Sequence, residues 1–155
     1  MKTNAMRILE AAQIPYTVLS YNFDLDHLDA LSAAKQLKLD PFQLCKTIVM
    51  RNNLQQIYLF CIPGPTTISL KKARKVIGAT TLELVEQEEL RQLTGYVRGG
   101  VSPLGMTHPY PVLIDENVQI NSQVAVSAGQ RGLQILLAVS DLLKITHGTF
   151  ADIIT

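Results

Sequence analysis

Apolar residues recur every three to four positions in several segments of the chain, which is the spacing of helices that bury one face. Most of these segments follow Ser, Thr or Asp, whose side chains accept hydrogen bonds from the free N–H groups of a first helical turn. We expect helices after Thr3 (through Ala12), after Asp29 (with Leu31, Ala34 and Leu37 inward), after Ser69 (ending at Gly78), over 85–93 and after Ser140.

Other segments are rich in β-branched and aromatic residues or alternate between polar and apolar positions, which favours strands. We expect strands at 16–21, 46–51, 56–62, 111–115, 123–127 and 133–139. Asn52 and Asn53 separate the second and third of these, and asparagine tolerates the left-handed conformations of hairpin turns. Because strands and helices are intermixed without a regular βαβ repeat, the pattern predicts an α/β or α+β fold with a mixed, strongly curved sheet.

The 155 residues are 47% hydrophobic and 17% charged, enough apolar surface for an ordered core and a length typical of one domain over 1–155. The chain opens on an amphipathic segment that does not resemble a signal peptide. Charged residues or glycine interrupt every apolar run that could cross a bilayer. We therefore expect a cytoplasmic protein without a membrane partner.

The formal net charge of +1 argues against a broad footprint on a nucleic-acid duplex, so DNA is not an expected partner and any RNA contact should be local. One expected helix carries Lys71, Lys72, Arg74 and Lys75 on its outer face. A solvated face and an RNA-contacting patch both fit this run of charge.

The two cysteines, Cys45 and Cys61, would lie opposite each other in the hairpin if its turn comprises residues 52–54. Two buried thiols in a reducing compartment and a redox pair are both compatible with that placement. The histidines His27, His108 and His147 are far from one another and from the cysteines, so no zinc-type spacing exists. We expect neither a metal nor a cofactor, since phosphate-binding and dinucleotide glycine motifs are also lacking.

Two features could carry chemistry. Lys46 opens a strand with apolar neighbours, where an inward-pointing ammonium would need a partner or a ligand, although a lysine at a strand start often faces solvent. Glycine-rich loops at 99–105 and 127–132 would let backbone amides approach a ligand closely, or would simply form turns.

The combination of Lys46-Thr47, the loop from Gly95 to Gly105 and the segment from Val126 to Leu133 resembles the YbaK family of free-standing aminoacyl-tRNA deacylases. These are relatives of the editing domain of bacterial prolyl-tRNA synthetases. The likeness extends over essentially the whole chain, and it implies one domain with a curved, mostly antiparallel sheet flanked by helices. It also implies removal of a wrongly attached amino acid from tRNA, with Cys-tRNA(Pro) as substrate and Cys-tRNA(Cys) as a further one.

The resemblance assigns roles to particular residues of this chain. Lys46 matches the essential lysine of the family and is the expected catalytic residue, acting as a charge that positions the tRNA end. The expected substrate-binding residues are Tyr21, Thr47, Gly99, Gly100, Val101, Ser102, Pro103, Ser127 and Gly129. The implied partner is the tRNA acceptor end. Because the near-neutral charge gives little grip on a whole tRNA, we expect a synthetase, prolyl-tRNA synthetase in particular, or another tRNA-binding protein to supply tRNA selectivity.

One position departs from the family pattern. Close YbaK relatives have an acidic residue two positions after the Arg-Gly pair, whereas this chain has Gln134 there. A neutral amide thus replaces a carboxylate that could bind the amino group of the substrate. Three alternatives stay open: a deacylase of another small aminoacyl-tRNA such as Ala-tRNA(Pro), a non-catalytic module that binds aminoacyl-tRNA or a nucleotide, and a structural partner of a synthetase.

Overall fold

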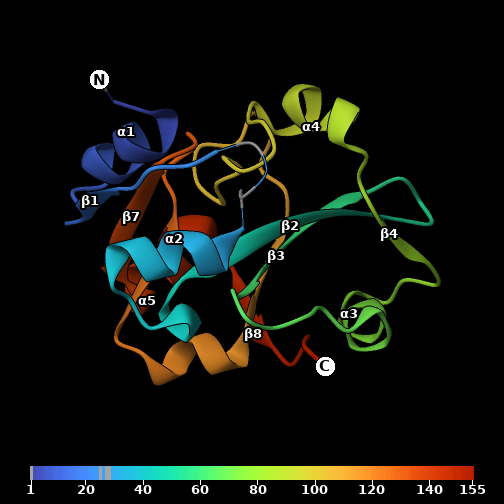
Figure 1. The fold of residues 1–155 in the computed structure, drawn as a ribbon. Helices are drawn as coiled ribbons and strands as arrows, with labels where there is room; N and C mark the ends of the chain where they lie inside the picture. The colour runs from blue at the N-terminus through green and yellow to red at the C-terminus, as the bar shows by residue number, and fades with distance from the viewer. Residues whose placement is uncertain (1, 25, 27–28) are drawn as a thin grey trace.

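The strands of the protein form two sheets in a computed structural model that describes residues 2–24, 26 and 29–155 (Figure 1). The larger sheet has the order β4-β2-β3-β5-β8, and the smaller has the order β1-β7-β6. The strands span Thr17–Ser20 (β1), Cys45–Asn52 (β2), Ile57–Pro63 (β3), Leu82–Leu84 (β4), Val112–Asp115 (β5), Gln123–Ser127 (β6), Leu133–Ala138 (β7) and Thr149–Ala151 (β8).

Pairing in the sheets is mixed. β5 runs parallel to both β3 and β8, and the remaining strand pairs are antiparallel. An isolated parallel bridge between Leu44 and Ala125 links the two sheets. The predicted mixed α/β class is confirmed. The short strands β4 and β8 were not predicted, because three residues leave too little pattern to distinguish a strand from a loop.

The helices are α1 (Asn4–Ala11), α2 (Ala30–Leu37), α3 (Leu70–Ile77), α4 (Gln87–Thr94) and α5 (Val139–Thr146), with short 3-10 turns η1 (Pro41–Gln43) and η2 (Glu116–Ile120). Three predicted caps are confirmed, since the side chains of Thr3, Asp29 and Ser69 each accept a hydrogen bond from a first-turn N–H. The cap predicted at Ser140 is wrong. α5 begins two residues earlier than predicted, after Ala138, and has no side-chain cap.

The β2–β3 hairpin forms as predicted, but its turn lies one position later, at residues 53–55, which shifts the cross-strand pairing by two residues. Asn52 pairs with Gln56 instead of entering the turn, and its side chain accepts hydrogen bonds from the N–H groups of Leu54 and Gln56. Cys45 therefore lies opposite Pro63, and Cys61 lies opposite Thr47, so the expected cysteine pairing is wrong. Both cysteines are buried free thiols.

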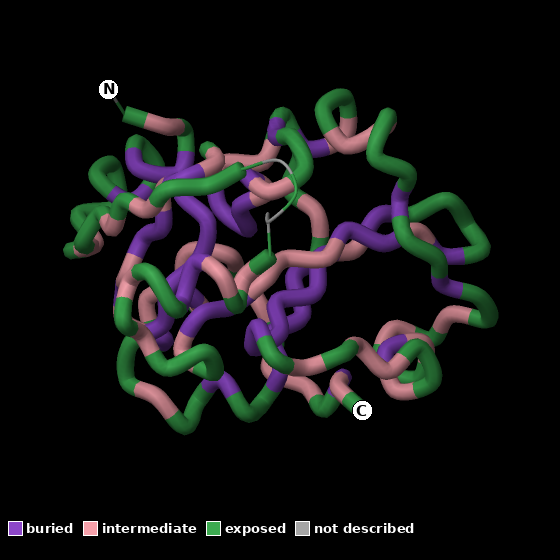
Figure 2. Tube along the Cα trace, viewed as in Figure 1, coloured by how far each residue is buried: buried purple, intermediate pink, exposed green. Residues whose placement is uncertain are grey.

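Buried residues run along the central strands, and a helix closes each apolar cluster (Figure 2). The largest cluster includes Leu9 of α1, Ile135 of β7 and Leu142 of α5. A second cluster, which includes Phe60 and Ala73, lies under α3. Leu31 of α2 was expected to face the core but is 49% exposed, because the buried face of this short helix consists of Ala33 and Ala34.

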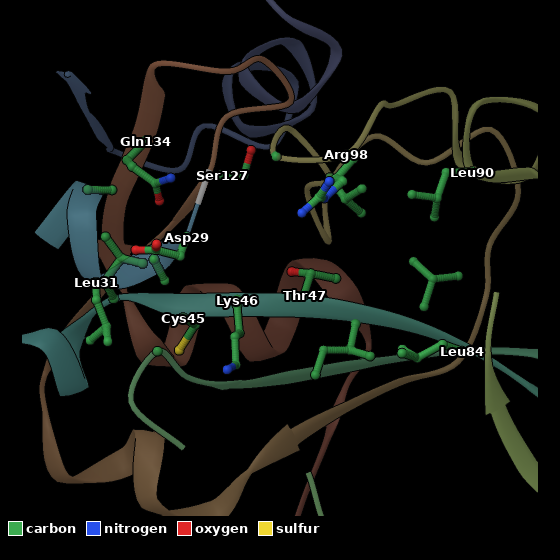
Figure 3. Close-up of a pocket in the computed structure, with 18 of the residues that line it drawn as sticks. Asp29, Leu31, Cys45, Lys46, Thr47, Leu84, Leu90, Arg98, Ser127 and Gln134 are labelled. Atoms are coloured by element: carbon green, nitrogen blue, oxygen red, sulfur yellow. The ribbon is translucent and has the colours of Figure 1, made fainter. Parts of the chain in front are cut away.

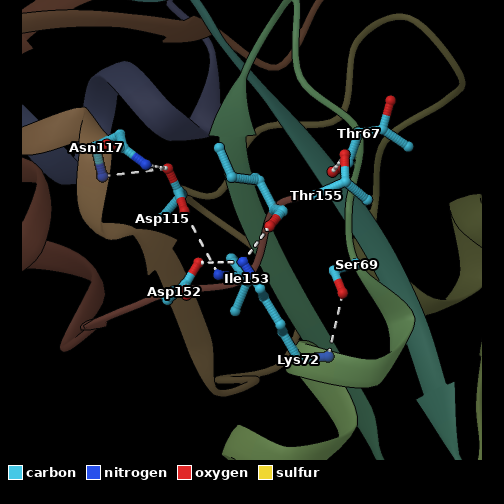
Figure 4. A network of polar contacts seen from close by, with 9 residues as sticks. Thr67, Ser69, Lys72, Asp115, Asn117, Asp152, Ile153 and Thr155 are labelled. Atoms are coloured by element: carbon cyan, nitrogen blue, oxygen red, sulfur yellow. Dashed lines mark hydrogen bonds and ion pairs between the residues drawn. The ribbon is translucent and has the colours of Figure 1, made fainter.

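The buried carboxylate of Asp115 accepts a hydrogen bond from the C-terminal segment and helps to hold it against the sheet (Figure 4). Its carboxylate accepts from the backbone N–H and the side-chain amide of Asn117 at 3.1 Å, and from the N–H of Ile153 at 3.5 Å. Lys72 of α3 forms an ion pair with Asp152 at 3.0 Å. These contacts fix β5 and β8 beside the hairpin that carries Lys46. In the part of the chain that the structure describes, no helix has the length and apolar content to span a membrane.

Candidate functional site

A cavity of about 550 Å³ opens beside the first half of β2 (Figure 3). This volume lies within the range of small-molecule binding sites. Its walls come from segments far apart in the sequence: the start of α2, the loop at 98–101, residues 84–90 and the ends of β6 and β7. Figure 1 shows α2 beside the start of β2, while β4 lies at the far end of that strand.

β2 contributes five consecutive residues, 45–49, to the cavity lining. Neighbouring side chains of a strand point to opposite faces, and Figure 3 shows the Lys46 and Thr47 side chains leaving β2 in opposite directions. Because residues from both faces of β2 line the cavity, it lies along an edge of this strand. That edge pairs with β4 only from Met50 to Asn52, which leaves the first half of β2 open to the cavity.

Lys46 is half-buried at this edge, and its ammonium has no hydrogen-bond or ion-pair partner among the described residues. Burial lowers the pKa of Lys46 below its ordinary value of 10.5. Arg98 adds a second cation to the cavity wall. The carboxylate of Asp29 also lies in the wall and accepts a hydrogen bond from Ser32 at the start of α2. Two cations thus stand at this cavity, and Figure 3 shows them on opposite sides of β2.

Gln134 of β7 brings an unfilled acceptor to the cavity. Its side chain is only 5% exposed, and its Oε1 atom has no hydrogen-bond partner among the described residues. Figure 3 shows the amide directed from β7 toward β2. A buried polar atom left without a partner costs about 1–3 kcal/mol, so a ligand that donates a hydrogen bond here would recover that loss.

The structure brings six of the ten sequence-predicted site residues together around the cavity: Tyr21, Lys46, Thr47, Gly99, Val101 and Ser127. Tyr21 is half-buried, and its backbone N–H donates to the carbonyl of Gly132 at 2.9 Å. The Thr47 hydroxyl lies 3.8 Å from the Cys61 sulfur. Arg98 was not singled out from the sequence, because an arginine in a loop gives no signal of its own.

The other four predicted residues, Gly100, Ser102, Pro103 and Gly129, do not line the cavity. The N–H of Gly100 donates to the carbonyl of Val97 at 2.9 Å and is thus already engaged. The hydroxyl of Ser102 is fully buried and accepts from the N–H of Leu104.

Two of these glycines allow the loops behind the cavity to pack tightly. A Cβ atom at Gly100 would lie 3.2 Å from the backbone nitrogen of Arg131. Gly129, at φ +93°, lies against the ring of Tyr96, where a Cβ would come within 2.6 Å. Tyr96 itself donates to the carbonyl of Leu104, and burial raises its pKa to about 12. Gly100, Gly129 and Tyr96 thus hold the wall that Gly99 and Val101 present to the cavity.

No group of three or more His, Cys, Asp or Glu side chains within residues 2–24, 26 and 29–155 could hold a metal ion. His108 packs against Tyr110 with ring centroids 5.7 Å apart, and His147 is the C-terminal cap of α5. His27 lies outside the described residues.

Residues 27–145 match the family of aminoacyl-tRNA editing domains. The chain is 40% identical over 154 residues, 99% of its length, to EbsC of Enterococcus faecalis, a protein named as a candidate Cys-tRNA(Pro)/Cys-tRNA(Cys) deacylase, and covers 94% of it. It is 29% identical over 99 residues to the proline–tRNA ligase of Desulforamulus reducens, of which it covers 16%.

Solved structures agree with the sequence comparisons. A candidate trans-editing enzyme for prolyl-tRNA synthetase superposes with a TM-score of 0.83 at 25% identity, covering 100% of this chain and 99% of that one. The hypothetical protein APE2540 superposes with a TM-score of 0.89 at 20% identity over 99% of this chain and all of its own, which shows a shared fold.

Proposed function

The chain belongs to the aminoacyl-tRNA editing domain family, and we propose that it is a trans-editing deacylase that removes cysteine from Cys-tRNA(Pro). The observation that carries this proposal is the 40% identity, over 99% of the chain, to the E. faecalis protein named for that substrate. The cavity supports it, because it is large enough for an amino acid and part of a terminal nucleotide and carries an ammonium without a partner among the described residues. This activity fits the cytoplasmic location expected from the sequence.

The reaction needs no catalytic triad. An aminoacyl ester is already activated, so holding its end still and stabilising the charge on its carbonyl oxygen can supply much of the acceleration. In hydrolysis, water adds to the carbonyl carbon, the C–O bond to the ribose breaks, and the ribose oxygen takes a proton. A cysteinyl ester offers a second route, in which its own sulfur bonds to the carbonyl carbon, the C–O bond to the ribose breaks and the thiol proton ends on the ribose oxygen.

Lys46 would hold the tRNA end in either route. Its ammonium is a compact charge that suits a phosphate or a ribose oxygen, and it has no partner among the described residues that would compete. Arg98 stands at the same cavity and would strengthen the attraction for the terminal phosphate. The α-ammonium of the amino acid would donate to the unfilled Oε1 of Gln134.

Gln134 also favours a second candidate, the deacylation of Ala-tRNA(Pro). A neutral amide holds the α-ammonium less strongly than a carboxylate, so binding would depend more on the side chain that the cavity accommodates. Alanine is smaller than cysteine and would enter the same space. This candidate keeps the reaction and changes only the amino acid.

Prolyl-tRNA synthetase is the partner that we propose for tRNA selectivity. The net charge of +1 gives this chain little means of gripping a whole tRNA, and part of the chain resembles a segment of proline–tRNA ligases. In the absence of the synthetase, the affinity of this chain for its tRNA substrate should then fall only slightly between 50 and 200 mM salt. A loss of about 10³-fold, as expected for six or more phosphate contacts, would contradict this small footprint.

A panel of aminoacyl-tRNAs tests the proposed function. Purified protein is incubated with Cys-tRNA(Pro), Ala-tRNA(Pro), Pro-tRNA(Pro) and Cys-tRNA(Cys), and the release of uncharged tRNA is followed. Fastest turnover of Cys-tRNA(Pro) supports the first candidate, and fastest turnover of Ala-tRNA(Pro) supports the second. Binding without turnover of any substrate would overturn both and indicate a non-catalytic module. Mass analysis of the released amino acid separates free cysteine from its cyclic thioester.

A further inference from the structure

Thr47 presents its backbone N–H and C=O groups to the cavity. In an antiparallel ladder, one residue directs its N–H and C=O toward one edge of the strand, and the next residue directs both toward the other edge. The bonds from Asn52 N–H to Gln56 C=O and from Gly64 N–H to Leu44 C=O show that even-numbered residues of this segment face β3. Thr47 and Val49 therefore direct their backbone groups toward the opposite edge.

Neither strand that approaches this edge of β2 extends as far as Thr47: β6 pairs before it and β4 pairs after it. On one side the Leu44–Ala125 bridge to β6 is isolated and is not continued toward Ser127. On the other side the carbonyl of Val49 accepts from the N–H of Val85 at 3.1 Å, just before β4 begins to pair. Among the described residues, no strand pairs with Thr47 on this edge. The cavity fills the gap where β2 separates from β6 and β4.

We propose that the aminoacyl group of the substrate pairs with Thr47 as a strand of one residue. This inference rests on the proposed deacylase function. An α-amino ester in an extended conformation carries its ammonium and its ester carbonyl on the same side, as a strand residue carries its N–H and C=O. The N–H of Thr47 donates to the ester carbonyl oxygen, and the C=O of Thr47 accepts from the α-ammonium.

This pairing gives Thr47 a positioning and charge-stabilising role that does not depend on its side chain. A rigid strand amide aimed at the carbonyl oxygen stabilises the negative charge that develops there when a nucleophile adds. The ammonium has three N–H donors, so one can reach Thr47 while another reaches the unfilled Oε1 of Gln134. Opposed residues of an antiparallel pair place their side chains on the same face, so the substrate side chain lies on the Thr47 face of β2.

Replacing single backbone amides by esters tests the proposal. Incorporation of the α-hydroxy analogue of threonine at position 47 deletes the N–H and leaves the side chain unchanged. Loss of one such donor from an enzyme site lowers the rate constant about 10²–10³-fold. We expect a loss of this size for Cys-tRNA(Pro) with only a small loss of thermal stability, because the exchange deletes no donor of the ladder and only weakens the Lys46 carbonyl as an acceptor toward β3. The matched control is the same exchange at Met50, whose N–H faces β3; it should lower stability and leave the rate unchanged.

The outcomes separate the two proposals. Full activity of the Thr47 ester, in a protein that deacylates Cys-tRNA(Pro), would overturn the pairing and leave the proposed function standing. Absence of deacylation by the unmodified protein would overturn the proposed function itself. Amide hydrogen exchange gives an independent readout. The Thr47 amide should exchange faster than that of Met50 in the free protein and become protected by a non-hydrolysable 3′-cysteinylamino-adenosine. A Thr47 amide that the analogue does not protect would also overturn the pairing.

Discussion

Gln134 stands directly opposite Ser127 in the β6–β7 ladder, and its side-chain oxygen is buried in the cavity wall without a partner among the described residues. The hydroxyl of Ser127 already accepts a hydrogen bond from the N–H of Gly129 at 3.2 Å. Within the described part of the chain, the cavity thus combines an unfilled acceptor at Gln134 with a cation at Lys46 that has no partner. The end of an aminoacyl-tRNA carries a matching donor, its ammonium, and a matching anion, its phosphate.

Replacing Gln134 by methionine should make the protein more stable and less active. The variant keeps the length of the side chain and removes the buried oxygen, so we expect the free energy of unfolding in urea to rise by about 1 kcal/mol. The value of kcat/KM for deacylation should fall about tenfold, because the ammonium loses an acceptor. Gln92→Met on the exposed face of α4 is the control and should change neither quantity. Unchanged kcat/KM in Gln134→Met would remove this residue from the site.

The half-buried Lys46 should make stability depend on pH. Its pKa is lowered by burial, so the folded protein releases this proton at a lower pH than the unfolded chain. Between the lowered pKa and 10.5 the unfolded chain binds more protons, and the contribution of Lys46 to the free energy of unfolding rises with pH. Urea unfolding of the wild type and of Lys46→Met should show Met as the more stable at pH 8 and a narrowing difference toward pH 10.5. A difference that is constant over this range would contradict the burial of the ammonium.

The packing of the second glycine loop predicts a large difference between two alanine substitutions. Gly129→Ala places a Cβ against the Tyr96 ring at a left-handed backbone position, and we expect a loss of about 2–3 kcal/mol. Gly78→Ala has a similar backbone conformation and open space around the new atom, so it should cost only about 1 kcal/mol. Urea unfolding of both variants measures the difference. Equal losses in the free energy of unfolding would show that the contact with Tyr96 adds nothing to the cost of the substitution.

The two cysteines should be unreactive in the folded protein. Burial raises the pKa of Cys61 to about 12 and raises that of Cys45 well above its usual range, so little thiolate exists at neutral pH. A thiol reagent such as dithionitrobenzoate should label neither residue in the native state and both after denaturation. Fast labelling of the native protein, or fewer than two thiols after denaturation, would contradict two buried free cysteines.

Much of the fold follows from local sequence signals. The caps at Thr3, Asp29 and Ser69 and the β2–β3 hairpin were predictable, because each depends on residues close together in the chain. The hairpin register was missed because Asn52 uses its side chain to pair within the turn. β8 was missed because its partner β5 is more than thirty residues away, and long-range pairing leaves no local pattern.

The candidate site was only partly predictable for the same reason. The local pattern only made Lys46 a candidate, because a lysine at a strand start often faces solvent, and the resemblance to the YbaK family singled it out. The glycine motif predicted which loops surround the cavity but not which residues line it. Gly100 and Gly129 instead allow the two loops to pack tightly behind the cavity wall. The open edge at Thr47 depends on where β4 and β6 stop pairing with β2, which only the assembled sheets reveal.

The most direct test of the account is the single-turnover rate of cysteine release from Cys-tRNA(Pro) by the wild type and by Lys46→Ala. We predict rapid release by the wild type and at least about a 100-fold loss in the variant, with circular dichroism showing that the variant is folded. Lys35→Ala, on the exposed face of α2, is the matched control and should retain the wild-type rate. A folded Lys46→Ala variant that releases cysteine at the wild-type rate would contradict the central role of Lys46.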